Sequence, residues 1–362
     1  MPLPHDRLLV GVIPGEGIGA EVIECALAVL RLVTEVHGRR LSIEEGGLIG
    51  RQSEAESGVA LSDEIVGFCE SIFERGGAIL NGPGGGRYVY DLRDRLDLFF
   101  KISPLQSRIG LTEASRVKGD VVNGMDILVA RENSGGVYQG AWQGHSHQQP
   151  ATHSFQYSRE QVQRFLAASA RLAAKRQGRL TVVWKESGVP TISQLWRECA
   201  LEAAQQFDIE MNTVDVDLMA YRLVHEPSAF DVVAAPNLFG DILGDLGAVL
   251  LGSRGNSFSG NFNGRGGGVY QTNHGAAYDL AGTNKANPVG QILSMAMMLR
   301  ESFELFAEAN AVEEGVRQVW SEGWRTADVA TPRCRVIGTR EFSDLVADRA
   351  VNCIQTSLRK AS

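Results

Sequence analysis

Short apolar runs alternate along the chain with stretches whose apolar residues recur every three or four positions. Residues 7–13 form the first run, and residues 20–36 then place Val22, Ala26 and Val29 at helical spacing. The run predicts a buried strand and the spacing predicts a helix. Further strands are predicted at 78–80, 126–130, 180–184 and 230–234, and further helices at 158–176, 192–206, from Phe239 onward and at 289–309. This alternation indicates an α/β protein.

Two positions are typical of helix starts, and one stretch shows neither the strand pattern nor the helix pattern. Ser158 suits an N-cap with Gln161 as its capping-box partner, and Pro288 suits the first turn of the helix that follows it. Residues 139–157 are rich in Gly, His and Gln and show little helical periodicity. Irregular stretches of this length are unusual inside a compact protein. This one is either an extended arm that pairs with a partner subunit or a long surface loop.

Composition limits the function classes. The 362 residues predict two domains or one large one. The net charge of -8 argues against a surface devoted to nucleic acid or anionic membrane, and no segment is apolar for long enough to predict a membrane span. The odd number of cysteines, with no CxxC pair, argues against a disulfide framework or zinc site and favours a cytoplasmic location. The cysteines are Cys25, Cys69, Cys199, Cys334 and Cys353.

Glycine is over-represented, at 41 of 362 residues. Residues 15–20 follow a predicted strand and satisfy G-x-G-x-x-A, the pattern of a dinucleotide-binding Rossmann turn. Glu44 and Glu45 lie at roughly the distance at which such a fold carries its ribose-binding acid. The pattern is weak alone, and a tight strand-to-helix turn explains it equally.

Asp241 and Asp245 are four residues apart and therefore share one face of a predicted helix. Two like charges among Leu and Ile residues destabilise a helix unless something compensates, and a divalent cation with oxygen ligands would do so. The alternative is two solvated acids near a helix N-terminus.

Longer motifs follow one another in order: PGEGIGAEV at 14–22, LRDRLDL at 92–98, VARENSGGVYQG at 129–140, HGAAYDLAG at 274–282 and Asn-Pro at 287–288. In these segments the chain resembles the metal-dependent β-decarboxylating dehydrogenases, which include the isopropylmalate, isocitrate, homoisocitrate and tartrate enzymes. The resemblance covers nearly the whole chain. Several long motifs in one order are far more specific than a single glycine turn.

The resemblance implies a two-domain isopropylmalate-dehydrogenase-like α/β fold rather than a Rossmann fold. Residues 1–100 plus 256–362 would form a large cofactor-binding domain, and residues 101–255 a central metal and dimerisation domain. The stretch 139–157 would then be a protruding arm that clasps a second subunit. The active sites of such a homodimer lie between domains and across the subunit interface.

The implied reaction is NAD-dependent oxidative decarboxylation of a 3-substituted malate to a 2-oxo acid, with Mg2+ or Mn2+. By resemblance Asp217, Asp241 and Asp245 bind the metal, one of them from the partner subunit. The ion would acidify the substrate hydroxyl and stabilise the enolate. Lys185 would accept the hydroxyl proton, its pKa lowered by the metal and nearby cations, and Tyr138 would reprotonate the enolate carbon.

Carboxylate recognition is assigned by the same resemblance to Arg93 and Arg131, whose guanidinium groups suit bidentate pairing. The resemblance also assigns binding of the adenosine half of the cofactor to a loop and to an asparagine that follows this loop. Asp279 occupies the position of the acid that binds the ribose 2'-hydroxyl and would repel a 2'-phosphate, so NAD is expected rather than NADP. The cofactor residues are His274, Gly275, Ala276, Ala277, Asp279 and Asn287.

Several positions depart from the family pattern. Ser103 stands where the family carries a second carboxylate-binding arginine, and Lys101 stands in place of an asparagine and restores the charge from a shifted position. Ser187 and Gln271 replace a family asparagine and glutamate. These changes put the usual substrate and nicotinamide contacts in doubt.

The specificity segment, residues 82–91, carries Arg87 near the place where isocitrate enzymes bind a distal carboxylate. A polar or anionic third substituent, of the carboxyalkyl or phosphonomethyl type, is therefore favoured, although Arg87 pointing to solvent would remove this argument. Three alternatives stay open: 3-isopropylmalate or tartrate as substrate, a metal-free Rossmann oxidoreductase, and a noncatalytic regulatory paralogue.

Overall fold

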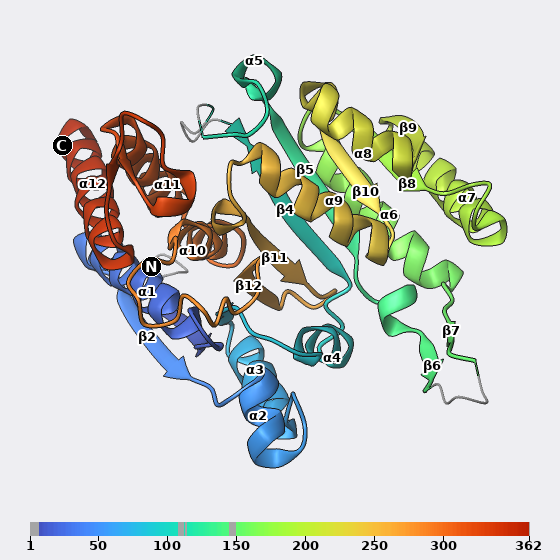
Figure 1. Cartoon of the computed structure of the whole chain (residues 1–362), viewed down its shortest axis with the longest axis horizontal. Coiled ribbons are helices and arrows are strands. Elements are labelled where there is room, and N and C mark those ends of the chain that lie inside the picture. The colour runs from blue at the N-terminus through green and yellow to red at the C-terminus, as the bar shows by residue number, and fades with distance from the viewer. Residues whose placement is uncertain (1–6, 108–111, 113, 145–149, 362) are drawn as a thin grey trace.

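A ten-stranded mixed sheet runs through the molecule and positions the other elements (Figure 1). The computed structural model describes residues 7–107, 112, 114–144 and 150–361. In order across the sheet, the strands are β2 (Arg40–Glu45), β1 (Arg7–Ile13), β3 (Ala78–Asn81), β12 (Gly268–Thr272), β11 (Phe258–Phe262), β4 (Phe100–Gln106), β5 (Asp126–Glu132), β10 (Val232–Ala235), β8 (Arg179–Trp184) and β9 (Glu210–Asp215).

The sheet has a parallel block at each end and an antiparallel centre. Strands β2, β1, β3 and β12 are parallel to one another, as are β5, β10, β8 and β9. Between the blocks, β11 is antiparallel to both β12 and β4, and β4 is antiparallel to β5. A Rossmann sheet is parallel through its nucleotide-binding halves. The prediction of an α/β fold is confirmed, and the Rossmann alternative is wrong because two central strands reverse direction.

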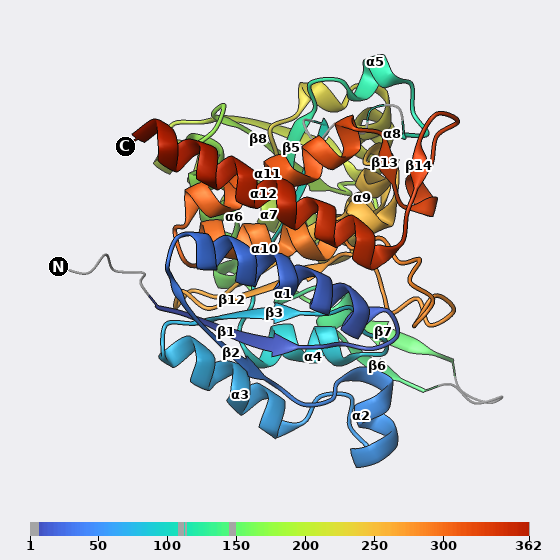
Figure 2. The same cartoon turned by 90° about the vertical axis from the view of Figure 1, so that its left-hand side faces the viewer.

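Helices cover both faces of this sheet. They are α1 (Gly19–Val36), α2 (Gly50–Ser57), α3 (Asp63–Glu74), α4 (Tyr88–Arg95), α5 (Gly119–Val122), α6 (Arg159–Ala174), α7 (Pro190–Phe207), α8 (Val216–His225), α9 (Asn237–Leu250), α10 (Val289–Glu301), α11 (Phe306–Ser321) and α12 (Thr339–Ala361). Short 3-10 turns are η2 (Val137–Gln139), η3 (Pro227–Ala229), η4 (Arg254–Asn256) and η5 (Ala327–Val329), and β13 (Trp324–Arg325) pairs with β14 (Arg335–Val336). Figure 2 shows β1 and β3 between α1 and α3. None of the helices in the described part of the chain is both long and apolar enough to cross a bilayer.

The buried side chains form separate clusters on the two faces of the sheet. One cluster lies wholly within residues 105–251, and another combines residues 9–98 with Val269. The largest cluster, however, joins α1 and α10–α12 to α6 and α7 across the sheet, with Trp196 and Trp320 fully buried in it. The division into 1–100 plus 256–362 and 101–255 stays a prediction, because the sheet and this cluster are continuous across it.

Most predicted elements are found within a few residues of their expected bounds, but one helix is wrong. The capping box of Ser158 and Gln161 is present at the start of α6. The single helix predicted at 289–309 is two helices, α10 and α11. Glu304 between them has φ 52°, a left-handed conformation that cannot continue a right-handed helix. The apolar pattern persists through the break because both helices bury their apolar faces in one core, so periodicity alone did not reveal it.

The stretch predicted as an arm or a surface loop forms a two-stranded antiparallel hairpin. Strands β6 (Ala141–Gln143) and β7 (Thr152–Ser154) are exposed along their whole length, and Figure 1 shows them projecting from the molecule. Residues 145–149 of the predicted 139–157 arm lie outside the described residues. A two-stranded hairpin is marginal in water without further packing. Its projection therefore favours the arm over a loop lying on the surface.

The glycine turn after β1 is explained by close packing. Gly17 has φ +59°, and a Cβ at this position would lie 2.1 Å from the carbonyl oxygen of Ala276. That same oxygen accepts a hydrogen bond from the amide of Ile18 at 2.8 Å. The turn therefore holds the segment around Ala276, which leaves no need for the pyrophosphate interpretation of the glycines.

We expect Gly17→Ala to lower the free energy of unfolding by about 3 kcal/mol, because left-handed strain of about 1 kcal/mol adds to an overpacking cost of about 2 kcal/mol. Gly38→Ala is the matched control, since Gly38 has φ +64° but nothing within 4 Å of an added Cβ. Its cost should be the strain alone, about 1 kcal/mol. Urea unfolding of both variants measures the difference, and equal losses would contradict the packing explanation.

Candidate active site

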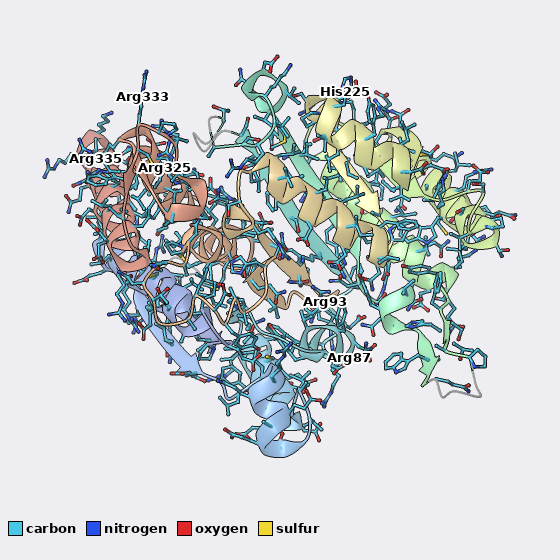
Figure 3. The ribbon with its side chains drawn as sticks, in the orientation of Figure 1. Arg87, Arg93, His225, Arg325, Arg333 and Arg335 are labelled. Carbon is cyan, nitrogen blue, oxygen red and sulfur yellow. The ribbon has the colours of Figure 1, made fainter. Side chains whose placement is uncertain are left out.

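Cationic side chains from three elements converge where the antiparallel centre of the sheet meets its second parallel block. Lys101 on β4 lies directly opposite Arg131 on β5, and Arg93 comes from α4. Figure 3 shows Arg93 and Arg87 beside α4, near the start of β4. Arg93, Lys101 and Arg131 are 5%, 6% and 3% exposed. The fold therefore buries three of the predicted substrate-binding cations at one place.

Asp241 is the acid that contacts this cluster. Arg131 donates from Nε and Nη2 to the side-chain oxygen of Asn237, at 3.0 and 2.9 Å, and from Nη1 to Asp241 Oδ1. The hydroxyl of Tyr138 donates to the other oxygen of Asp241 at 2.9 Å. Both Asn237 and Asp241 lie on α9, one turn apart. Gly240 between them must be glycine, because an added Cβ would lie 2.8 Å from the Arg131 side chain.

The pKa values of this cluster show an excess of positive charge. Burial, together with the charge of Arg131, lowers the pKa of Arg93 to about 9. Burial and the charges of Arg93 and Arg131 lower the pKa of Lys101 well below its usual value. Burial alone would raise the pKa of Asp241, but the neighbouring cations and the Tyr138 hydroxyl offset this and hold it below its ordinary range. A buried Nε of Arg93 has no hydrogen-bond partner. The site is therefore suited to an anion with several oxygen atoms.

Asp245 follows Asp241 by one turn of α9 and faces outward. It is 52% exposed and pairs with Arg254 at 3.1 Å. Asp241 is 39% exposed, so both carboxylates reach the surface of the cluster. Hard carboxylate oxygens are the donors that Mg2+ and Mn2+ prefer, so the chemistry of this pair fits either ion.

Lys185 and Asp217 form a second group away from these residues. Lys185 Nζ lies 2.6 Å from Asp217 and 3.2 Å from Asp215, at the ends of β8 and β9. Within one chain the pKa of Lys185 is raised, because its ammonium donates hydrogen bonds to Asp217 and Asp215, which stabilise the charged form. The expected lowering of this pKa depends on a nearby metal and other cations. In the single chain acids surround the lysine instead, so the lowering stays a prediction.

The three predicted metal ligands do not meet within one chain. Among the described residues, no three His, Cys, Asp or Glu side chains are placed to hold a metal together. Asp241 and Asp245 share α9, while Asp217 stands in the first turn of α8 beside Lys185. One chain thus presents two incomplete halves.

The predicted cofactor residues occupy a loop and the start of α10. Ala276 is buried against the glycine turn, Asp279 is exposed, and Asn287 is buried. Asn287 donates to Asn256 at 2.9 Å and to Asp328 at 3.0 Å. His274 and Gly275 begin the loop, with the His274 Nδ1 3.0 Å from the Gly275 carbonyl. The loop with Ala277 at φ 40° is therefore held from several sides.

Comparison with known proteins agrees with this architecture. The isocitrate/isopropylmalate dehydrogenase family model matches residues 9–346. The chain belongs to this family. A 3-isopropylmalate dehydrogenase of Geobacillus kaustophilus is 38% identical over 92% of this chain and 93% of its own, and one of Carboxydothermus hydrogenoformans is 36% identical over 93% of each. An isocitrate dehydrogenase structure from Methylococcus capsulatus has a TM-score of 0.81 at 26% identity, covering 95% of this chain and 99% of that one.

Family membership confirms the coarse chemistry. Enzymes of this family oxidise and decarboxylate hydroxy acids with NAD and Mg2+ or Mn2+, and they commonly act as dimers. The chain is an NAD-dependent decarboxylating dehydrogenase. The carboxylates on α9 suit the metal, and the cation cluster suits the hydroxy acid.

The structure explains two departures from the family motifs. Ser103 faces Asn273, whose side-chain nitrogen donates to the serine oxygen at 3.2 Å and to Ser257 at 2.8 Å. Gln271 accepts from the Asn81 side chain at 2.8 Å. Ser103 on β4 is thus bonded to the residue after β12, and Gln271 on β12 is bonded to the neighbouring strand β3. Ser187 is exposed in the turn after Lys185.

Arg87 lies between the cluster and the arm. Its guanidinium donates to the carbonyl of Tyr138 at 3.1 Å, pairs with Asp91 at 3.3 Å, and stacks 4.5 Å from the ring centre of Trp142. It also lies 5.6 Å from the ring of Tyr90. Four groups thus hold the Arg87 guanidinium, while its side chain stays 40% exposed to solvent.

Sequence reasoning missed Asn237, which accepts two of the Arg131 hydrogen bonds. Its spacing was a usable signal, since it precedes Asp241 by four residues and so shares its helix face. It also missed Trp142, whose stacking on Arg87 depends on the arm lying near α4. No local pattern announces that contact.

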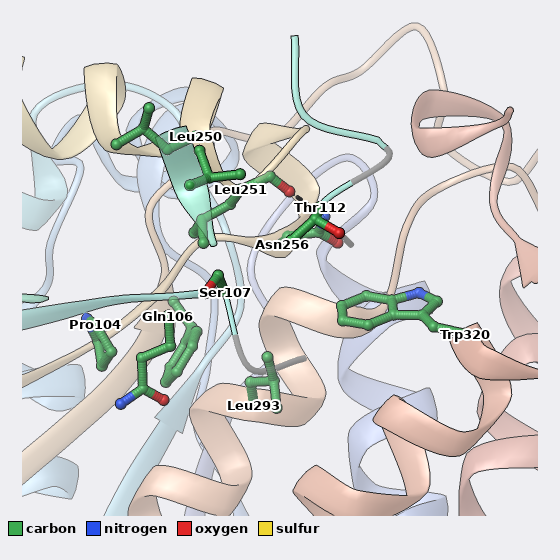
Figure 4. Close-up of a pocket in the computed structure, with 11 residues that line it drawn as sticks. Pro104, Gln106, Ser107, Thr112, Leu250, Leu251, Asn256, Leu293 and Trp320 are labelled. Atoms are coloured by element: carbon green, nitrogen blue, oxygen red, sulfur yellow. Dashed lines mark hydrogen bonds between the residues drawn. The ribbon is translucent and has the colours of Figure 1, made fainter. Parts of the chain in front are cut away.

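A further cavity lies between α9, α10 and β4 but is not a substrate site. Figure 4 shows its lining, which includes Leu250, Leu293 and Trp320. Its volume is about 20 Å3, enough for about one water molecule.

We expect Lys101→Met to stabilise the ligand-free protein by about 1 kcal/mol at neutral pH, because it removes a buried charge that has no bonded acid. Since the pKa of Lys101 is lowered on folding, the unfolded chain binds the extra proton. Wild-type stability should therefore rise with pH up to about 10.5, and the advantage of the variant should shrink. Urea unfolding from neutral pH to about 10.5 measures the difference in the free energy of unfolding between the wild-type protein and the variant. Lys285→Met, at an exposed position, is the control, and a pH-independent difference would contradict the buried-charge explanation.

Proposed function

We propose that this enzyme oxidatively decarboxylates a 3-substituted malate whose third group is polar or anionic, of the carboxyalkyl or phosphonomethyl type. The observation that carries the proposal is the burial of Arg93, Lys101 and Arg131 around Asp241, which is the one acid bonded to them among the described residues. Asp241 balances one of these three cations, and the two malate carboxylates would balance the other two. A further cation, Arg87, lies at the same Tyr90 ring as Arg93 and favours a third substituent that is anionic or strongly polar.

The position of Lys101 supports this assignment. Lys101 and Ser103 are two residues apart on β4 and therefore face the same side of the sheet. The cation is thus displaced by about 7 Å along one face relative to the arginine of the family motif. An anionic group at a different place in the substrate follows from such a displacement.

Arg87 and its neighbours support the same substrate class. Arg87, held over Trp142 and Tyr90, lies within the segment predicted to set specificity. Arg87 thus adds a fourth cation next to the cluster of Arg93, Lys101 and Arg131. An isopropyl group would offer Arg87 no polar partner in the substrate.

We infer that the metal is held by Asp241 and Asp245 of one chain and by Asp217 of a second copy. When bound, the ion acidifies the substrate hydroxyl and stabilises the negative charge left when CO2 departs. In a single chain Asp217 faces Lys185, so both would enter the site together from the second copy.

The remaining roles follow from proton positions. Lys185 accepts the hydroxyl proton as the hydride leaves C2 for NAD, and once beside cations it loses the environment that raises its pKa. The pKa of Tyr138 is raised by burial and by Asp241, so the phenol keeps its proton. It can then donate that proton to C3 after CO2 has departed.

The proposed dimer interface includes α8 and α9. These adjacent helices expose Leu218, Tyr221, Ile242 and Val249, each at least 41% exposed. Contiguous apolar residues of this kind mark a protein interface. They flank Asp217 and Asp245, so covering this face with a second copy would bring the two incomplete halves together. The projecting β6–β7 arm would clasp that copy.

On the cofactor side, His274, Gly275, Ala276, Ala277 and Asn287 hold the adenosine half and the exposed Asp279 accepts from the ribose. Its carboxylate disfavours a 2'-phosphate, so NAD is preferred over NADP.

Among the alternatives, 3-isopropylmalate is the second candidate, because the curated relatives carry that name at up to 38% identity. Tartrate dehydrogenation has no comparable support. A noncatalytic paralogue is disfavoured, since Lys185, Tyr138 and the three aspartates are all retained.

We expect carboxymethyl- or phosphonomethyl-malate to exceed 3-isopropylmalate and tartrate in kcat/KM by at least about tenfold, because a site built for a polar group rejects a substrate that leaves it unpaired. Purified enzyme with Mn2+ would be assayed by NADH formation, with NADP and EDTA as the cofactor and metal controls. A preference for 3-isopropylmalate would overturn the substrate class. Higher activity with NADP would overturn the role of Asp279.

We expect Lys185→Ala and Asp241→Asn to be inactive alone but to regain about one quarter of wild-type activity when refolded together, because half the dimers would contain one intact site. Lys185→Ala mixed with Asp217→Asn is the control, since both changes lie in the same half and leave no intact site. Recovery in neither mixture would show that the active sites are not shared.

A further inference from the structure

Glu16 is a buried carboxylate that joins three separate segments. It lies in the turn between β1 and α1 and is 2% exposed. Its Oε1 accepts from the amide of Gln52 at 2.7 Å, and its Oε2 accepts from the amide of Gly85 at 2.8 Å and from the hydroxyl of Tyr278 at 3.0 Å. Hydrogen bonds to a charged acceptor are roughly twice as strong as neutral ones. Glu16 therefore ties the first turn of α2, the glycine-rich segment 82–86 and the loop after His274.

Two glycines make room for this arrangement. Gly50 has φ +67°, and a Cβ there would lie 2.3 Å from Glu16 Oε2. A Cβ on Gly85 would lie 2.5 Å from the hydroxyl oxygen of Tyr278. A side chain at either position would push the carboxylate and the phenol apart. The backbone is thus shaped around this contact.

Tyr278 belongs to the segment assigned to the cofactor. It lies between Ala277 and Asp279, and its ring packs under the guanidinium of Arg51 at 5.3 Å. Burial and the neighbouring Glu16 raise the pKa of its hydroxyl, so the phenol remains a donor at neutral pH. Gly85, the other residue bonded to Oε2, belongs to the segment that precedes Arg87.

We propose that Glu16 and Tyr278 are positioning residues that couple the substrate side of the active site to its cofactor side. Their hydrogen bond holds segment 82–86 and the 274–279 loop in one relative arrangement, so that binding on one side orders the other. The inference rests on the proposed function, which assigns the two segments to malate and to NAD.

Two properties follow from such a tie. Without this hydrogen bond, each ligand must order its own segment when it binds, and this ordering lowers both affinities. The factor by which each ligand raises the affinity for the other also falls. The reduction is the same for either order of addition, because coupling between binding sites is reciprocal. The reacting groups lie elsewhere, at Lys185 and Tyr138, so turnover at saturation is spared.

Tyr278→Phe tests the tie, since it removes only the hydroxyl and keeps the ring over which Arg51 packs. We expect the KM for NAD and for the 3-substituted malate each to rise at least about tenfold, as for the loss of one hydrogen bond to a charged group, with kcat within twofold. Calorimetric titration of NAD with and without malate and Mg2+ should show the coupling between them reduced by a similar factor.

Thr283→Ala is the matched control, because Thr283 lies on the same loop and its hydroxyl bonds only the nearby carbonyl of Leu280, at 2.7 Å. It should leave both KM values unchanged. Glu16→Gln and the double variant complete a double-mutant cycle. In the Glu16→Gln background, Tyr278→Phe should raise the two KM values by a smaller factor than it does in the wild-type protein.

The outcomes separate this inference from the proposed function. Unchanged KM values and coupling in Tyr278→Phe would overturn the inference, and so would a lowered Tm without any change in affinity. A wild-type enzyme that binds neither NAD nor malate would instead overturn the assignment of the two segments. If Glu16→Gln does not fold, Tyr278→Phe alone still decides.

Discussion

The contact between Arg131 and Asp241 is the interaction on which the rest of the site depends. Arg131 sits at the end of β5 directly opposite Lys101, and two like charges facing one another across adjacent strands destabilise a sheet. Asp241 and Asn237 offset this repulsion, because their side-chain oxygens accept hydrogen bonds from all three nitrogens of the Arg131 guanidinium. That requires α9 to begin beside β5, with glycine at position 240 so that the helix can approach. Among the described residues Lys101 has no such partner, and in the function we propose the substrate anion would supply it.

The same contact also bears on the predicted metal ligands, which stay in two groups within one chain. One oxygen of Asp241 is bonded to Arg131 and the other to Tyr138, both of which hold the carboxylate in place. Asp217, at the far side of α8, is bonded to Lys185. Within the described part of one chain these carboxylates therefore form no common cluster. The site shared between two copies that we propose would bring them together, and the exposed apolar residues of α8 and α9 lie beside them.

Much of the fold was predictable because its signals are local. The strand at 7–13 was placed correctly, and the capping box at Ser158 located the start of α6, since both depend on residues close in sequence. The motifs located Arg93, Arg131, Tyr138 and Asp241, which the fold brings together. What failed depends on contacts distant in sequence. The helix break at Glu304, the reversed central strands and the acids around Lys185 each follow from tertiary packing, for which the chain carries no periodic signal.

The glycine-rich turn matches the sequence pattern of a nucleotide-binding turn, but its glycines pack against protein. Residues 15–20 match a nucleotide-binding turn, yet Gly17 faces the Ala276 carbonyl and Glu16 between the glycines binds Gly85 and Tyr278. In a Rossmann fold such glycines admit a phosphate. Here they admit protein backbone from the two segments that border the active site. By holding the loop that we assign to the cofactor, the turn would contribute to cofactor binding. Short glycine motifs report that something approaches the backbone closely, and only the surrounding strands reveal whether it is a ligand or the protein itself.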